Sequence, residues 1–208
     1  MEGGTAAFDR SVILMFRDAA NPAMPIGPPW LVEGARDLTS LGSFLVLGII
    51  LALAAIYLVL AGKHTFAWLL LLAVLGGATL NTLLKIGFAR PRPEFIAPIV
   101  RVFTPSFPSG HATLAAVSYL TIAALLARTA NSRSLRMFFI VAGVLLTISV
   151  GVSRIYLGVH YPTDVFAGWC IGSAWALLCW TLMRRMQRRG QVAPAETDHE
   201  ASKQRTSA

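Results

Sequence analysis

The sequence is poor in charged residues, and acidic residues are almost missing from most of its length. Charged residues make up 13% of the 208 residues, whereas hydrophobic residues make up 55%. A soluble domain carries roughly a quarter charged residues. Between Thr39 and Ala195 the only acidic residues are Glu94 and Asp164. This excludes a water-exposed surface over most of the chain, and the sequence predicts an integral membrane protein.

Cysteines are also scarce, and a targeting signal is missing. Cys170 and Cys179 lie nine positions apart in one apolar run, on opposite sides of a helix at about 100° per residue. This predicts neither a disulfide between them nor a metal site. The first 30 residues lack the basic and apolar regions of a signal peptide, so we expect internal segments to drive insertion. The net charge of +8 comes from short loops and not from a continuous basic face, which argues against a nucleic-acid partner.

Long apolar runs are what the sequence has instead. A helix needs roughly 20 residues to cross a hydrocarbon core of about 30 Å. Five runs approach this length, and none has an acid in its interior: Leu41–Gly62, Thr65–Ile86, Ala112–Ala127, Met137–Val152 and Asp164–Met183. We predict an all-α fold, a polytopic transmembrane helical bundle of five spans over residues 41–189.

The two ends of the chain differ from the bundle. Within residues 1–40, Phe8, Val12, Met15 and Phe16 follow the spacing of an amphipathic helix. This predicts an interfacial helix lying on the membrane, with packing against the bundle as the alternative. Residues 190–208 are polar without an apolar period, which predicts a disordered tail.

Basic residues in the loops predict the orientation. Three groups fall on one side of the predicted bundle: Lys63 and His64; Arg128, Arg133 and Arg136; and Arg184, Arg185, Arg188 and Arg189. Loops rich in Lys and Arg stay in the cytoplasm. We therefore expect a cytoplasmic C-terminus, with residues 1–40, 87–110 and 153–163 on the outer side.

Three polar clusters lie on that outer side. The first runs from Lys85 through Arg92, the second is Pro108-Ser109-Gly110-His111, and the third contains Arg154, His160 and Asp164. Helical hairpins bring these loops to one end of the bundle. We expect the clusters to converge on one site.

The first cluster favours an anion. Lys85 and Arg92 can also mark the membrane boundary by snorkelling to water. Four bases, however, share an outward loop with one acid: Lys85, Arg90, Arg92, Arg101 and Glu94. Pro91 and Pro93 stiffen this loop, which suits a binding wall.

The second cluster predicts a helix start with Ser109 as its N-cap. Free N–H groups and the positive end of the helix dipole make such a start an anion site. Gly110 would let the backbone approach a phosphate closely. The structural and functional interpretations agree here.

The third cluster places His160 and Asp164 four residues apart, with Pro162 in the first turn of a helix that begins near Tyr161. Asp164 can be a dipole-favoured acid, but an acid at a membrane border is costly unless it is paired. It can instead hold one imidazole nitrogen of His160 and leave the other free to attack. A zinc site of His111, His160 and Asp164 is the rival hypothesis. Lys85, Arg92 and Arg154 would repel the dication.

Together these residues resemble the signature of the type 2 phosphatidic acid phosphatase superfamily. The three blocks are Lys-x6-Arg-Pro at Lys85, Pro-Ser-Gly-His at Pro108, and Ser-Arg-x5-His-x3-Asp at Ser153, over about 80 residues. Members of that family typically have six membrane spans, against the five predicted here.

The resemblance implies a metal-independent phosphatase without a cofactor that is inhibited by vanadate. It implies that His160 is the nucleophile and becomes phosphohistidine, that Asp164 orients it, and that His111 is the acid and base. It also implies a set of phosphate-binding groups: Lys85, Arg92, Ser109, Gly110 and Arg154. Arg90, Arg101 and Glu94 are outside the signature and receive no catalytic role.

The expected partners are membrane lipids and a lipid phosphate substrate. The resemblance suggests phosphatidic acid, phosphatidylglycerol phosphate, a lipid A phosphate or, as a narrow favourite, polyprenyl diphosphate. A bacterial inner membrane with a periplasmic site fits the loops and the small size. An anionic-lipid carrier or flippase would use the same cations without hydrolysis. A vanadium-dependent haloperoxidase has a similar site, but those enzymes are soluble. Oligomeric state is not predicted.

Overall fold

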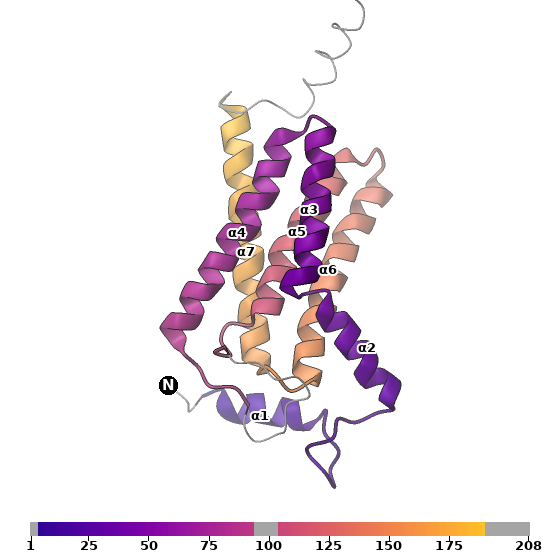
Figure 1. Ribbon diagram of the computed structural model, residues 1–208, viewed down its shortest axis with the longest axis vertical. Helices are drawn as coiled ribbons and strands as arrows, with labels where there is room; N and C mark the ends of the chain where they lie inside the picture. The colour runs from indigo at the N-terminus through magenta and orange to yellow at the C-terminus, as the bar shows by residue number, and fades with distance from the viewer. Residues whose placement is uncertain (1–3, 94–103, 190–208) are drawn as a thin grey trace, which may run out of the picture.

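The computed structural model describes residues 4–93 and 104–189, and these residues form seven helices and one isolated bridge between Arg17 and Pro25. Four helices are long and apolar enough to cross a membrane: α4 (His64–Phe88), α5 (Gly110–Thr129), α6 (Arg133–Tyr156) and α7 (Pro162–Arg188). They run along a common long axis (Figure 1). The predicted all-α membrane bundle is confirmed.

The first predicted span, Leu41–Gly62, is shorter and bent in the structure. Helix α2 (Pro29–Ser40) ends before it, and α3 (Phe44–Leu60) follows at 48°, so the two reach the length and hydropathy of a span only as a bent pair. The break has a local cause, because the hydroxyl of Ser43 accepts a hydrogen bond from the Val46 amide and caps α3. Its 17 residues rise about 26 Å. Five spans are therefore reached only when α2 and α3 are counted together.

Helix α5 lies at the centre of the bundle and packs against α4, α6 and α7. Lipid tails are as apolar as leucine, so membrane helices associate through close packing at small residues. Gly168 and Gly172 of α7 let that helix approach α5, since a Cβ at either would lie within 3 Å of a backbone oxygen of α5 or its N-cap. This contact fixes the start of α7 against the start of α5, and both starts belong to the predicted site.

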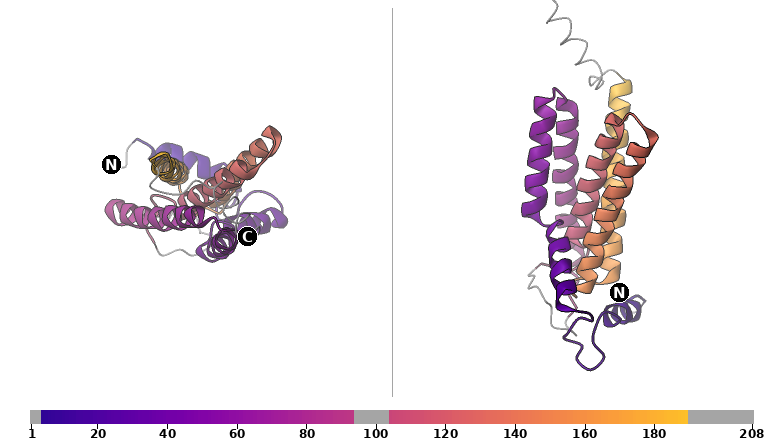
Figure 2. Two further views of the ribbon diagram at one scale, coloured as in Figure 1. Left: turned by 90° about the horizontal axis from the view of Figure 1, so that it is seen from above. Right: turned by 90° about the vertical axis from the view of Figure 1, so that its right-hand side faces the viewer.

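Helix α1 (Ala6–Leu14) lies across one end of the bundle, next to the start of α7 (Figures 1 and 2). Its buried residues are Asp9 and Ile13, whereas Phe8 and Met15 of the predicted apolar stripe are 56% and 71% exposed. Helix α1 therefore packs against the bundle, which was the alternative prediction, but the face that packs carries the acid Asp9. Phe8 and Met15 remain available to a membrane interface, whereas Phe16 packs against Tyr156, and the interfacial location stays a prediction.

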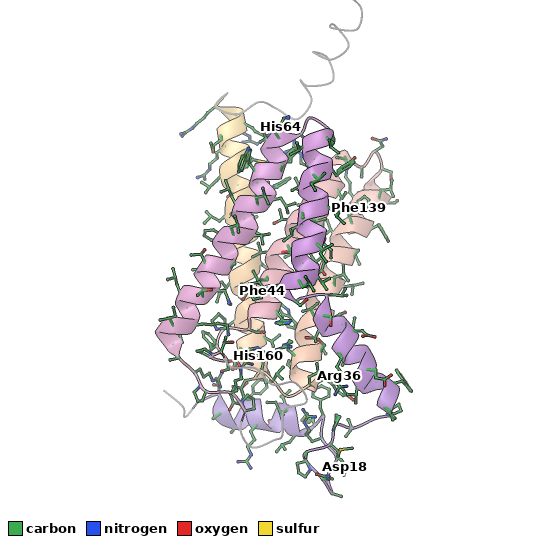
Figure 3. The ribbon with its side chains drawn as sticks, in the orientation of Figure 1. Asp18, Arg36, Phe44, His64, Phe139 and His160 are labelled. Atoms are coloured by element: carbon green, nitrogen blue, oxygen red, sulfur yellow. The ribbon has the colours of Figure 1, made fainter. Side chains whose placement is uncertain are left out.

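The predicted hairpin arrangement is confirmed. His64 lies at one end of the bundle and His160 at the other, together with α1 and α2 (Figure 3). The three basic loops gather at the His64 end, and the three polar clusters at the His160 end. Residues 190–208, Glu94 and Arg101 lie outside the described residues.

The tight contact between α5 and α7 yields a stability prediction. In Gly172→Ala, the new Cβ would lie 2.5 Å from the Thr113 carbonyl oxygen and 2.7 Å from the Ala116 Cβ, so a helix must move. We expect a loss of about 1–3 kcal/mol, measured as a lower melting temperature by tryptophan fluorescence in detergent. Gly48→Ala in α3 is the control, because nothing lies within 4 Å of its Cβ. Equal stability of the two variants would contradict this packing.

Candidate active site

The three polar clusters come from different helix ends and meet at one end of the bundle. Lys85 is in the last turn of α4, and Arg154 is in the last turn of α6. Ser109 is the N-cap of α5, followed by Gly110 and His111. His160 lies in the loop before α7, and Asp164 is in the first turn of that helix. The predicted convergence is therefore present.

His160 and Asp164 form a buried pair. They are 1% and 0% exposed, and the imidazole Nδ1 lies 3.4 Å from Asp164 Oδ2. The same carboxylate oxygen accepts a hydrogen bond from the Tyr161 amide at 3.0 Å. This bond closes the first turn of α7, which Pro162 begins. The turn therefore holds the carboxylate against the imidazole.

The other imidazole nitrogen points at a cation. Arg92 Nη1 lies 3.2 Å from His160 Nε2. A guanidinium can only donate, so Nε2 is the acceptor, and the proton of a neutral ring lies on Nδ1 toward Asp164. The lone pair on Nε2 faces the cationic side of the site, where an anion would lie.

The environment of His160 favours its neutral form. Burial lowers the pKa of the imidazole well below its usual 6.5, and the nearby charges of Arg154, Arg92 and Lys85 lower it further. A neutral imidazole keeps the lone pair that a nucleophile needs.

Three cations surround the pair, and none forms an ion pair within the residues that the structure describes. Lys85 donates to the Pro105 carbonyl, Arg92 Nε to the Thr104 carbonyl at 2.8 Å, and Arg154 Nη1 to the Thr39 hydroxyl at 3.1 Å. These neutral acceptors hold the side chains but leave their charge uncompensated. The site is therefore strongly positive.

Two buried donor groups in this region have no hydrogen-bond partner: Arg154 Nε and Ser109 Oγ. Ser109 stands at the predicted N-cap position, but its side chain makes no capping bond. Buried polar groups are rarely left unpaired. Two such donors beside three cations without an ion-pair partner suit an anion with several oxygens.

His111 lies in the first turn of α5, half-buried, with its side chain packed behind Gly42. The charges of Arg154, Arg92 and Lys85 act on His111 as they do on His160. The two imidazoles thus belong to one electrostatic site. Gly110 is packed near Asn81 and Lys85, where a Cβ would lie 3.3 Å from the Asn81 amide nitrogen.

The sequence interpretation missed a second ring of contacts around Asp164. Arg90 donates to Asp164 Oδ1 at 2.7 Å and to Asp9 Oδ2 at 2.8 Å, and it stacks over Tyr161 with 4.2 Å to the ring centre. Asp9 also accepts from the amide and the hydroxyl of Thr163 at 3.0 and 2.7 Å. No spacing in the sequence links Asp9 to Arg90. The only feature of the sequence that singled out Asp9 was its position beside the apolar stripe of the predicted amphipathic helix.

The zinc alternative is not supported by the donor geometry. Across residues 4–93 and 104–189, no group of three or more His, Cys, Asp or Glu side chains is arranged to hold a metal ion. His111, His160 and Asp164 therefore do not form a ligand set.

The fold and the site define a membrane-embedded protein with a cluster of cations around a buried histidine and aspartate. The family model of the PAP2 superfamily matches residues 66–188. The chain is 41% identical to phosphatidylglycerophosphatase B of Bacillus subtilis, over 72% of this chain and 74% of that protein. It is 36% identical to decaprenylphosphoryl-5-phosphoribose phosphatase of Mycolicibacterium smegmatis, over 68% and 73%.

A solved structure is similar over nearly the whole chain. A transmembrane PAP2-type phosphatidylglycerolphosphate phosphatase from Bacillus subtilis superposes with a TM-score of 0.79 at 28% identity, over 90% of each chain. The chain belongs to the PAP2 superfamily, and the resemblance seen in its sequence is confirmed.

The buried neutral His160 predicts a dependence of stability on pH. Below pH 6.5 the unfolded chain protonates this histidine while the folded chain does not, so the unfolded state binds more protons. The free energy of unfolding should therefore decrease as the pH is lowered, by up to about 1.4 kcal/mol per pH unit from this residue. We expect the melting temperature to drop less in His160→Gln than in the wild type between about pH 7.5 and about pH 5.5.

The exposed His64 at the opposite end provides the control (Figure 3). His64→Gln should follow the wild type over the same pH range. If the melting temperature of His160→Gln depended on pH as that of the wild type does, the imidazole of His160 would not be held neutral in the folded chain.

Proposed function

We propose that this chain is a metal-independent lipid phosphatase that works through a phosphohistidine on His160. The observation that carries the proposal is the position of Nε2. This nitrogen is an unprotonated acceptor that lies against Arg92. The other ring nitrogen, Nδ1, lies against the buried carboxylate of Asp164. Membership of a family with named phosphatases supports hydrolysis.

In the first half-reaction, His160 Nε2 would attack phosphorus as the bond to the lipid oxygen breaks. His111 would protonate the departing oxygen, and the negative charge of Asp164 would stabilise the imidazolium that forms. In the second half, His111 would take a proton from water as its oxygen attacks phosphorus. The phosphorus–nitrogen bond then breaks, releasing inorganic phosphate and restoring neutral His160.

The phosphoryl oxygens would be held by Lys85, Arg92 and Arg154, with the Ser109 hydroxyl and the Gly110 amide. The uncompensated charges and the unpartnered Ser109 Oγ and Arg154 Nε support this assignment. Donors fixed before the reaction stabilise the transition state without reorganisation, and removing one typically costs about 3 kcal/mol.

The substrate would be a phosphorylated lipid, because the site lies at the end of membrane-spanning helices, where a lipid headgroup can reach it. The relatives are named for phosphatidylglycerophosphate and for decaprenylphosphoryl phosphoribose, among others. Phosphatidylglycerol phosphate therefore joins polyprenyl diphosphate as a first substrate to test. We also propose a bacterial inner membrane, with the site facing the periplasm and the C-terminus in the cytoplasm. The basic loops at the opposite end of the bundle support this orientation, because loops rich in Lys and Arg stay in the cytoplasm.

His160→Ala is the decisive variant. We expect turnover to fall below detection while the lipid phosphate still binds, because the cations remain. Rapid denaturation of the wild type in alkaline detergent, after mixing with radiolabelled substrate, should trap an acid-labile, base-stable phosphoenzyme that the variant lacks. His64→Ala, at the other end of the bundle, should behave as the wild type (Figure 3). A carrier of anionic lipids would instead keep its transport in His160→Ala.

Phosphate release in detergent from a panel of lipid phosphates defines the substrate. Vanadate should inhibit release, and a chelator should leave it unchanged. If the chelator abolished turnover, the result would support the zinc-site hypothesis instead.

Asp9 should affect the chemistry from a distance. It contacts Arg90 and Thr163, and Arg90 in turn contacts Asp164. In Asp9→Asn, the weakened hold on Arg90 should let Asp164 and His160 shift, lowering kcat by roughly tenfold to hundredfold. KM should stay constant, since Asp9 is not among the groups assigned to the phosphate. Asp37→Asn, an exposed acid of α2, is the control. An unchanged kcat in Asp9→Asn would show that α1 does not position the site.

A further inference from the structure

A second cationic cavity lies at the end of the bundle opposite the catalytic site. It has a volume of about 750 Å³ and opens between α5, α6 and α7. Four arginines from these three helices line it: Arg128, Arg136, Arg184 and Arg188. Its apolar wall includes Ala124, Ile140 and Trp180. None of these residues belongs to the site described above.

Two of these arginines are held in place by contacts other than a carboxylate. Arg128 stacks over Phe66 and Trp180, with 5.4 and 5.6 Å to the ring centres, and Arg136 Nε donates to the Ala130 carbonyl at 3.2 Å. In the part of the chain that the structure describes, none of the four arginines forms an ion pair. Guanidinium groups that converge repel one another unless an anion lies between them.

A buried donor points to the same ligand. Gln187 lines the cavity, and its amide nitrogen Nε2 is buried without a hydrogen-bond partner. An unsatisfied donor among guanidinium groups is typical of a missing acceptor. The acceptor must be negative and must offer several oxygen atoms, as a phosphate does.

An apolar groove continues from this cavity toward the middle of the bundle. A second cavity of about 290 Å³ shares Ala124 and Trp180 with the first. Its other walls include Leu69, Leu120 and Leu177, from α4, α5 and α7. These residues lie farther from the arginine end along their helices. The polarity of the cationic cavity and of the groove matches that of a headgroup and of the upper part of an acyl chain.

We propose that this cavity binds an anionic glycerophospholipid from the membrane leaflet opposite the catalytic site. Its phosphate would lie among the four arginines and Gln187, and one acyl chain would follow the apolar groove. The preference for basic residues on the cytoplasmic side explains arginines at this end of the helices. It does not explain their convergence from three helices on one cavity, the unpaired amide or the adjoining groove. The proposal is independent of the catalytic mechanism.

Native mass spectrometry of the full chain in detergent tests the proposal. The probes are dioleoylphosphatidylglycerol, which is an anionic phosphodiester, and zwitterionic dioleoylphosphatidylcholine. The wild type should retain one more phosphatidylglycerol than phosphatidylcholine per chain. Arg128→Gln/Arg184→Gln should bind that extra lipid roughly thirtyfold more weakly, from the loss of two cations near the phosphate.

The matched control removes the same charge from the same end of the bundle. Lys63→Gln/Arg189→Gln changes two cations that do not line the cavity, and it should bind phosphatidylglycerol as the wild type does. Both double variants should hydrolyse a water-soluble phosphate monoester at the wild-type rate, which shows that they are folded.

Four outcomes would overturn the proposal. Equal weakening in both double variants would indicate general charge attraction, and equal binding of the two lipids would mean that the headgroup charge is not recognised. Displacement of the lipid by inorganic phosphate at similar concentration would indicate a soluble anion. Phosphatidylglycerol binding that appears only after Glu196, Asp198 and Glu200 are changed to glutamine or asparagine would mean that the C-terminal segment occupies the cavity.

Discussion

The burial of one carboxylate, Asp164, organises the catalytic end of this molecule. Its side chain has no exposed surface, and a charge removed from water is stable only where charged and hydrogen-bonding partners replace the water. Arg90 supplies the opposite charge, the Tyr161 amide binds one oxygen, and the His160 imidazole lies against that same oxygen. The backbone oxygen of Asp164 accepts from the Ser109 amide at 3.0 Å, which ties the start of α5 to the start of α7. Each partner comes from one of the polar clusters, so satisfying this carboxylate assembles the site.

Unlike Arg90, the other three cations of the site form no ion pair among the described residues. Lys85, Arg92 and Arg154 are held by neutral oxygen atoms, and their charges are balanced by no carboxylate among the described residues. In the proposed mechanism, this arrangement would raise the energy of the empty site and lower that of a site holding a phosphoryl group. The fixed guanidinium and ammonium groups would then supply the electrostatic stabilisation that a metal ion supplies in other phosphatases. The same cations hold His160 neutral, because they lower its pKa together with burial.

The sequence was informative wherever chemistry depended on local spacing or on the path of the helices. Four residues separate His160 from Asp164, so one helical turn brings them together, and hairpin topology carries His111 and Lys85 to the same end. The bend before α3 was missed because α2 carries charged residues among its apolar ones, so this helix did not appear as part of the apolar run that begins at Leu41. The contact between Asp9 and Arg90 was missed for a deeper reason. The two residues are 81 positions apart, and only the tertiary fold places α1 over the start of α7.

The catalytic roles of the signature residues and the orientation in the membrane remain proposals, and charge asymmetry supports the orientation. The described acids Asp9 and Asp164 lie at the catalytic end, and Asp18 lies there too (Figure 3). Among the described residues, the arginines of the opposite end form no ion pair with an acid. The two ends therefore differ in the acids that they carry, and loops rich in Lys and Arg are retained on the cytoplasmic side. In the proposed orientation, the bundle would present these arginines to anionic headgroups of one leaflet, and its catalytic cations to a phosphorylated lipid in the other. Both ends would then recognise phosphate, but the buried pair of His160 and Asp164 lies at only one of them.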